Sequence, residues 1–415
     1  MLFNGLQAWR MPTTIRLMSL VLILLQLDAV SSLSLQRRLA TFGLAFTLIS
    51  PSNAYIAPLA DVGVKEFLVK DSREWLRLSL PSGKSINMGS NQVNDIDKSI
   101  QENLELVRLR LEQVGYTSPS AFTKPLTDAT LAENMIVNNM ERLIRNSLDA
   151  DEAKALITNE LIPAISSLKD SIKNKDFKST MEYQEKSASL FYKLRKLQLP
   201  PATLPYTIPD EYSSLPQLKG RATIEMVVQK KQGGFRLADG KTIINPVIFT
   251  IELDGYHAPL TCGNFVDMIN KKIYDNMEIQ KVDQLVVQTG RSTSKIERKI
   301  PLELFYRYDT EPTYGITSDD DNRATEAVAL PFQATGALGM ARLNDDVDSA
   351  TSEFFLFKFN QALNPPGRNT LDGFYTLFGF VTSNEELLDQ VTLEDKVVSI
   401  KILDGLQNLV VKQQK

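Results

Sequence analysis

The sequence is poor in cysteine and histidine, with one residue of each in 415. The single cysteine, Cys262, excludes an internal disulfide. The single histidine, His257, excludes metal sites built from several histidines and leaves one position for the imidazole of a nucleophilic triad. No Lys/Arg-rich stretch with interleaved aromatics occurs and the formal net charge is −4, so we expect no nucleic-acid partner. We also expect no metal site and no cofactor.

Cys262 and His257 lie close together in the stretch YHAPLTCGNF. One interpretation is a catalytic dyad, with Asp254 as the only acidic residue nearby to orient the imidazole. The other is a buried structural thiol beside a surface imidazole. The sequence favours the second interpretation, because the neighbourhood supplies little else for nucleophilic catalysis.

The first 54 residues carry two short apolar stretches with the flanks of export signals. Residues 16–32, RLMSLVLILLQLDAVSS, have a basic start, an apolar centre and a small-residue end, as in a secretory signal. Residues 36–54, QRRLATFGLAFTLISPSNA, resemble a twin-arginine signal. The alternative is two core helices of a folded domain. We predict a bipartite presequence over 1–54, removed from a mature chain that does not span a membrane and lies in the plastid thylakoid lumen.

Residues 55–198 have a helical pattern of apolar residues and form the first predicted domain. Residues 95–115 repeat apolar side chains at three- and four-residue steps and end at Gly115. A second helix is expected to begin at the N-capping residues Thr127 and Asp128, and Pro163 should kink a third. These repeats predict an antiparallel bundle of four or five helices.

Residues 199–218, LPPATLPYTIPDEYSSLPQL, are rich in proline. They form a predicted semi-rigid linker without a core of its own. From 219 to 415 the pattern changes to short strands, with helices expected at 259–271 and 384–391. Many short strands with few helices favour a closed antiparallel β-barrel. The fold class is therefore α+β.

Several motifs in 219–415 resemble those of the cyclophilin family, in order and spacing. APLTCGNFVDMI matches the family's P-x-T-x-x-N-F helix, YDN its Tyr-Asp-Gly turn, and LDGFYTLFG its Leu-Asp-Gly…Phe-Gly hairpin. With the helices and the proline-rich segment before them, the mature chain is similar to multidomain cyclophilins of the thylakoid lumen. The resemblance implies a helical bundle followed by a cyclophilin-like barrel with flanking helices.

The resemblance also implies the position of a peptide-binding groove. In the family an arginine follows Phe-His on a barrel strand, and the equivalent triplet here is Ile279-Gln280-Lys281. Lys281 is therefore the expected catalytic residue, weakened because lysine lacks the planar fork of arginine. Alternatively it is a solvated strand cation, paired with Glu353. The other implied substrate-binding residues are Gln288, Leu285, Val286, Met340, Ala341, Glu353, Phe355, Leu371 and Tyr375.

Several of these positions depart from the family pattern. Leu285 and Val286 replace a phenylalanine and a methionine, and Glu353 replaces a glutamine. The asparagine after Met-Ala is Arg342, and Tyr375 replaces a histidine. The proline pocket should therefore be less aromatic, with altered charge.

An insertion separates Gly290 from Gly336 and is expected to be an extra strand or flap, IPLELFYR, plus solvated loops. The acidic run at 319–321 has the charge for a cation but no metal-loop spacing, which favours a loop.

The resemblance implies a monomeric lumenal foldase that assists photosystem II assembly and maintenance. It would act on proline-containing client peptides or lumenal loops of photosystem proteins, with weak peptidyl-prolyl cis-trans isomerase activity. The alternative is a non-catalytic scaffold that holds clients with the groove and the helical domain.

Overall fold

The computed structural model describes residues 69, 71–82, 95–114, 118–292, 298–358 and 369–412. The presequence predicted over 1–54 lies outside these residues. Within them, none of the helices combines the length and the hydropathy needed to cross a bilayer.

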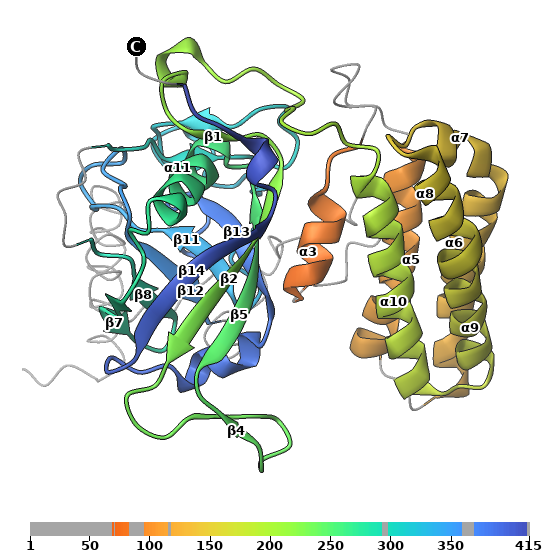
Figure 1. Cartoon of the computed structure of the whole chain (residues 1–415). Helices are drawn as coiled ribbons and strands as arrows, with labels where there is room; N and C mark the ends of the chain where they lie inside the picture. The colour runs from red at the N-terminus through yellow and green to blue at the C-terminus, as the bar shows by residue number, and fades with distance from the viewer. Residues whose placement is uncertain are drawn as a thin grey trace, which may run out of the picture. The chain divides into compact units, whose positions relative to one another are not determined.

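Four long helical segments of the N-terminal part contact one another in a ring (Figure 1). Each contacts two of the others, because α5 lies against α6 and α10, and α9 lies against the same two helices. Their apolar faces make a core of Ile100, Leu104, Ile165 and Phe191 and their neighbours. The predicted helical bundle is present in this form. The bounds are α3 Ser72–Ser79, α5 Ile96–Val114, α6 Thr123–Asn138, α7 Met140–Arg145, α8 Ala150–Ala155, α9 Ile162–Lys173 and α10 Phe177–Lys196.

Two local predictions in this part need correction. Thr127 and Asp128 do not cap a helix, because α6 begins at Thr123 after a short 3-10 helix, Pro119–Phe122. Asp128 is instead buried and bonded to Arg110, at 2.5 Å from Nε. The expected irregularity at Pro163 lies one turn earlier, as a π-helical turn over Leu156–Leu161, where the missing N–H and the ring of proline disturb the regular ladder.

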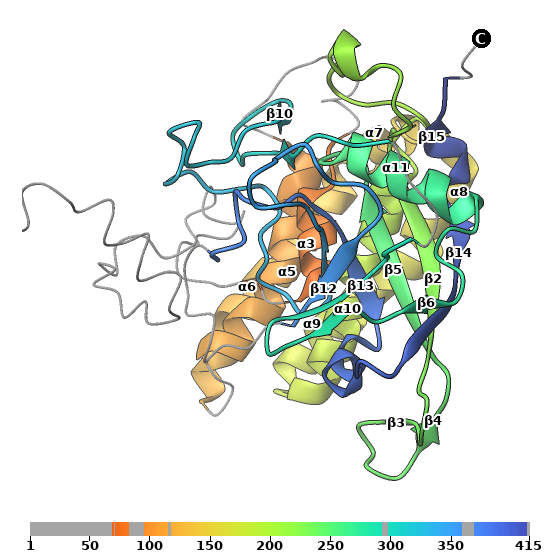
Figure 2. The same cartoon turned by 90° about the vertical axis from the view of Figure 1, so that its left-hand side faces the viewer.

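The C-terminal part is built on one antiparallel sheet, with nine strands among the described residues in the order β6-β14-β2-β5-β13-β11-β12-β8-β7. Figure 2 shows β2, β5 and β13 side by side in the sheet, with β12 beyond them. The short strands expected from 219 onward are present in this sheet. The bounds are β2 Arg221–Gln229, β5 Val247–Asp254, β6 Met277–Glu278, β7 Lys281–Val282, β8 Val286–Thr289, β11 Ala337–Met340, β12 Phe354–Phe357, β13 Leu377–Ser383 and β14 Lys396–Asp404.

The sheet is curled, but its hydrogen-bond ladder does not close into the predicted barrel. The edge strands β6 and β7 do not pair, although only Ile279 and Gln280 separate them along the chain. The Ile279 amide reaches the Asp395 carbonyl at 3.4 Å and the Gln280 amide bonds the Gln288 carbonyl at 2.9 Å. One short segment therefore switches from one edge of the sheet to the other.

Helix α11, Pro259–Asn270, fills the concave side of the sheet with Phe265 and Val266. Pro259 occupies its first turn as predicted. The other expected helix is a 3-10 helix, Glu385–Gln390. The insertion contains the two-residue strands β9, Glu303–Leu304, and β10, Thr313–Tyr314, paired with each other.

The proline-rich segment is packed rather than a bare spacer, which corrects the expectation that it lacks a core. Leu199 and Ile208 are each 8% exposed. The Tyr206 hydroxyl donates to the Tyr256 carbonyl at 2.9 Å, and the Ala202 amide to Asn408 Oδ1 at 3.0 Å. The segment is therefore tied to the C-terminal part at several points.

Candidate functional site

Three of the predicted site residues form one row across neighbouring strands. Lys281 on β7 lies opposite Gln288 on β8, and Gln288 lies opposite Phe355 on β12. Phe355 in turn lies opposite Gly339 on β11. Because directly opposed residues of antiparallel strands share a face, the Lys281, Gln288 and Phe355 side chains lie on the same side of the sheet. The register thus brings together the expected catalytic and peptide-binding positions.

Met340 was expected among the groove residues, but it does not lie on this face of the sheet. It lies opposite Phe354, one residue out of step with the row, and is 2% exposed. Both side chains are part of the core that α11 covers. Successive residues of a strand point to opposite faces, so the neighbouring Ala341 remains on the groove side.

Lys281 forms an ion pair, but with a different partner from the one expected. Its Nζ lies 2.9 Å from an Asp283 carboxylate oxygen, and the two side chains are 57% and 40% exposed. Partial burial raises the pKa of Asp283, but hydrogen bonds from Lys281 and from two backbone amides outweigh it and hold the pKa below its usual value. The pairing of Lys281 with Glu353 is wrong.

Glu353 is instead held by Gln288 and Arg291. Gln288 Nε2 donates to Glu353 Oε2 at 3.0 Å, and Arg291 Nε donates to Oε1 at 2.8 Å. The bond fixes the orientation of the Gln288 amide, whose nitrogen faces Glu353. Arg291 was not among the predicted residues, although it directly follows the VVQTG motif in the sequence.

Phe355, the expected floor of the groove, is 5% exposed. The Phe332 ring stacks on it with centroids 5.6 Å apart, and the Tyr375 ring meets it edge-on at 5.5 Å. Phe332 comes from the insertion and was not predicted, because an insertion has no counterpart in the family pattern. The predicted residues that pack half-buried on the same apolar cluster are Leu285, Val286, Ala341, Leu371 and Tyr375.

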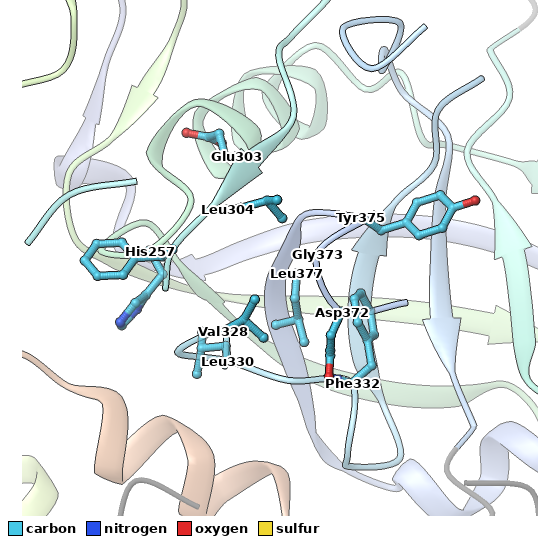
Figure 3. A pocket seen from close by; sticks show the side chains of 11 residues that line it. His257, Glu303, Leu304, Val328, Leu330, Phe332, Asp372, Gly373, Tyr375 and Leu377 are labelled. Carbon is cyan, nitrogen blue, oxygen red and sulfur yellow. The ribbon is translucent and has the colours of Figure 1, made fainter. Parts of the chain in front are cut away.

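A small recess lies beside this aromatic group (Figure 3). Figure 3 shows His257 and Glu303 on one side of the recess and Tyr375 on the other, with the phenol directed away from His257. Tyr375 and Phe332 also contact Phe355, so these two rings link the recess to the expected floor of the groove. The recess is lined by His257, Glu303, Leu304, Phe305, Val328, Leu330, Phe332, Asp372, Gly373, Tyr375 and Leu377.

Cys262 and His257 are structural groups. Cys262 is fully buried, its Sγ lies 3.1 Å from the Phe378 carbonyl oxygen, and burial raises the pKa of the thiol well above its usual value. His257 Nδ1 lies 3.1 Å from Asp254, and its side chain is only 12% exposed. The prediction of a buried thiol is confirmed for Cys262. The prediction of a surface imidazole is wrong, because His257 is enclosed by Asp254 and by the Phe305 ring, whose centroid lies 4.8 Å from that of the imidazole.

Glu303 is a buried carboxylate that the sequence analysis missed. It is 2% exposed and accepts hydrogen bonds from the Leu260 and Thr261 amides, at 3.0 and 2.7 Å, at the first turn of α11. Burial raises the pKa of Glu303 to about 7, against the opposing effect of these bonds. An acid inside the apolar run IPLELF was the available signal.

Comparisons with known proteins identify the family of this chain. The family model for cyclophilin-type peptidyl-prolyl cis-trans isomerases matches residues 242–404. A Synechocystis protein, named as a thylakoid lumen peptidyl-prolyl cis-trans isomerase, is 34% identical over 67% of this chain and 72% of its own length. The chloroplastic peptidyl-prolyl cis-trans isomerase CYP38 of Arabidopsis thaliana is 39% identical over 49% of this chain, and 47% of its own length is matched.

A third relative, the chloroplastic isomerase CYP37 of Arabidopsis thaliana, is 29% identical over 50% of this chain and 44% of its own length. The chain thus spans less than half of the two Arabidopsis relatives. These names agree on the compartment, and the predicted plastid thylakoid-lumen location is confirmed. The match to the Synechocystis protein extends well beyond the residues of the family model into the N-terminal helices. The chain belongs to the cyclophilin-type peptidyl-prolyl cis-trans isomerase family, among the cyclophilins of the thylakoid lumen.

Proposed function

We propose that the mature chain is a lumenal foldase that binds proline-containing segments in the groove and isomerises them weakly. Uncatalysed rotation about an amide bond has a barrier of about 18–20 kcal/mol because of resonance. A cation that hydrogen-bonds the substrate near the prolyl nitrogen lowers it by favouring the twisted amide. Lys281 is the proposed catalytic residue, and Gln288 and the apolar floor around Phe355 are the proposed substrate-binding groups.

The observation that carries this proposal is the Lys281–Gln288–Phe355 row, which aligns a cation, an amide and an aromatic floor on one face. The same site explains why the activity should be weak. Lys281 carries a compact ammonium instead of a guanidinium fork, and Asp283 competes with substrate for its protons. We propose that the clients are proline-containing lumenal loops of photosystem proteins. The foldase would thereby assist photosystem II assembly and maintenance.

A non-catalytic holding function is the second candidate. The observation that favours it is the cover on Phe355, whose ring is stacked by Phe332 and met edge-on by Tyr375. A proline ring must displace these two rings or bind beside them. Slow or weak binding of a client is compatible with this arrangement, whereas rapid turnover is not favoured by it.

Two measurements on the chain from residue 55 onward test both candidates. Peptide binding is followed by NMR titration with a Xaa-Pro peptide, and turnover by exchange between the cis and trans signals of the same peptide. Binding with accelerated exchange supports the foldase, and binding without acceleration supports the holder. Absence of binding contradicts both.

A further inference from the structure

The charged side chains that border the proposed groove are Lys281, Arg291, Arg342 and Glu353. All of them except Arg342 form an ion pair. Lys281 is paired with Asp283, at 2.9 Å. Glu353 is paired with Arg291, at 2.8 Å between Nε and Oε1. The fourth charged side chain is Arg342, and its surroundings are different.

The Arg342 guanidinium is oriented by neutral groups only. Nε donates to the Phe374 carbonyl at 2.9 Å and Nη1 to the Leu343 carbonyl at 2.8 Å, while the guanidinium carbon lies 5.3 Å from the Tyr375 ring centroid. Two of its five N–H groups are thus in use. Across the described ranges, no carboxylate lies within 4 Å of this guanidinium. Its charge is therefore held in place and left without an ion pair.

The acidic loop after Arg342 weakens this positive charge without cancelling it. The Asp346 carboxylate is bonded to Lys299 at 2.9 Å, and this bond is the main cause of its lowered pKa. The positive charge of Arg342 makes a smaller contribution to the lowering. Asp348 lies by the Leu302 amide, at 3.4 Å, and Asp345 is exposed. We therefore expect a modest and salt-dependent electrostatic effect.

Arg342 also lies beside the floor of the groove. Its guanidinium covers the Tyr375 ring, and that ring forms a T-shaped pair with Phe355, with centroids 5.5 Å apart. A peptide whose proline lies on Phe355 therefore brings its neighbouring side chains toward this wall. A preoriented guanidinium with free donors binds carboxylates better than it binds amides, because the donors match two oxygens and the charges attract.

We propose that Arg342 makes the groove selective for proline peptides that carry an aspartate or glutamate next to the proline. This inference rests on the proposed function, since it assigns a substrate class to the same groove. Arg342 is a binding residue in this account, and Lys281 remains the group that acts on the amide.

The test compares capped peptides that differ only in glutamate or glutamine, placed directly before or directly after the proline. Their affinities are measured by NMR titration for the wild type, Arg342→Met and Arg342→Lys. Lys401→Met is the matched control, because it removes one exposed cation from β14, which β2, β5 and β13 separate from β11. Circular dichroism confirms that each variant is folded.

In the wild type, glutamate in at least one position should bind about three- to tenfold more tightly than glutamine at low salt. The preference should vanish in Arg342→Met, be partly kept in Arg342→Lys, be unchanged in Lys401→Met and shrink as salt rises. Equal affinity for both peptides, or a preference that survives Arg342→Met, overturns the inference. If neither peptide binds the wild type, the proposed function itself fails.

Discussion

The Phe355 ring packs directly against Gly339. A Cβ added to Gly339 would lie 2.2 Å from Phe355 Cζ, so any larger residue must displace the ring. We predict that Gly339→Ala lowers the free energy of unfolding by about 1–3 kcal/mol and weakens peptide binding, because overpacking shifts the floor of the groove. Urea unfolding and peptide titration measure both effects. The double variant with Phe355→Leu, which lacks Cζ, should recover part of the lost stability; no recovery contradicts this cause.

Individual site residues were predictable from the sequence only where strand register decides them. The alternation in VVQTG and EFFLF places Gln288 and Phe355 on one face, and the structure has them there. The same alternation of side chains assigns Met340 to the core. Matching Met340 to the family motif does not take this alternation into account. The partners of the charged residues were not predictable, because Asp283 and Arg291 reach Lys281 and Glu353 through side-chain conformations that no sequence pattern encodes.

At the scale of elements, the buried Glu303 carboxylate links the insertion to the start of α11. Its pKa of about 7 lies above the ordinary glutamate value of 4.5, so the folded state binds the proton more tightly than the unfolded state. This contribution to stability is fully present below about pH 4.5 and is lost as the pH rises through about 7. At about 1.4 kcal/mol for each pH unit between the two values, it amounts to roughly 3 kcal/mol.

We predict that Glu303→Gln flattens this part of the pH profile, since glutamine accepts hydrogen bonds without titrating. The measurement is the difference between the free energies of unfolding of the variant and the wild type, from pH 5 to pH 8. The difference is needed because the pKa of Glu74 and of Asp128 is raised as well, with burial as the main cause. Parallel profiles for the two proteins contradict the assignment to Glu303.

The regular elements were predictable and the irregular ones were not. The strands β2, β5 and β14 and the helix α11 follow directly from apolar periodicity and a well-placed Pro259. The start of α6 was misplaced because Thr127 and Asp128 have capping side chains but lie within a helix that begins at Thr123. Phe332 and Glu303 come from the insertion, where contacts distant in sequence decide the structure.

At the scale of the whole molecule, Arg221 connects the sheet to the helices. Its side chain is 3% exposed and pairs with Asp254 at 2.7 Å. It also donates to the Leu76 carbonyl at 2.7 Å and to the Tyr192 hydroxyl at 2.6 Å. The described residues from 69 to 412 accordingly form one compact unit. We propose that the helical part, 55–198, and the cyclophilin-like part, 219–415, are nevertheless separate domains, joined by the proline-rich linker 199–218.

Limited proteolysis tests this division. We predict first cleavage between Leu199 and Gln217, with the two fragments remaining associated on gel filtration through the Arg221 contacts. Arg221→Ala should let the nicked fragments separate, because it removes the hydrogen bonds to Leu76 and Tyr192. Cleavage spread evenly along the chain counts against two domains.

The two predicted export signals imply a mature N-terminus near Tyr55. Mass spectrometry of the N-terminal peptide from the plastid-purified protein measures it. A start near residue 1, or recovery only in detergent, contradicts the presequence.

The isomerisation rate of Lys281 variants tests the central claim most directly. Lys281→Arg should raise turnover up to about tenfold, because a guanidinium offers two directed donors where the ammonium is shared with Asp283. Lys281→Ala should abolish turnover while peptide affinity stays within about twofold, because the apolar floor and Arg342 hold the peptide. Equal rates for the wild type and both variants would show that Lys281 is only a surface cation, and the holding function would then replace the foldase.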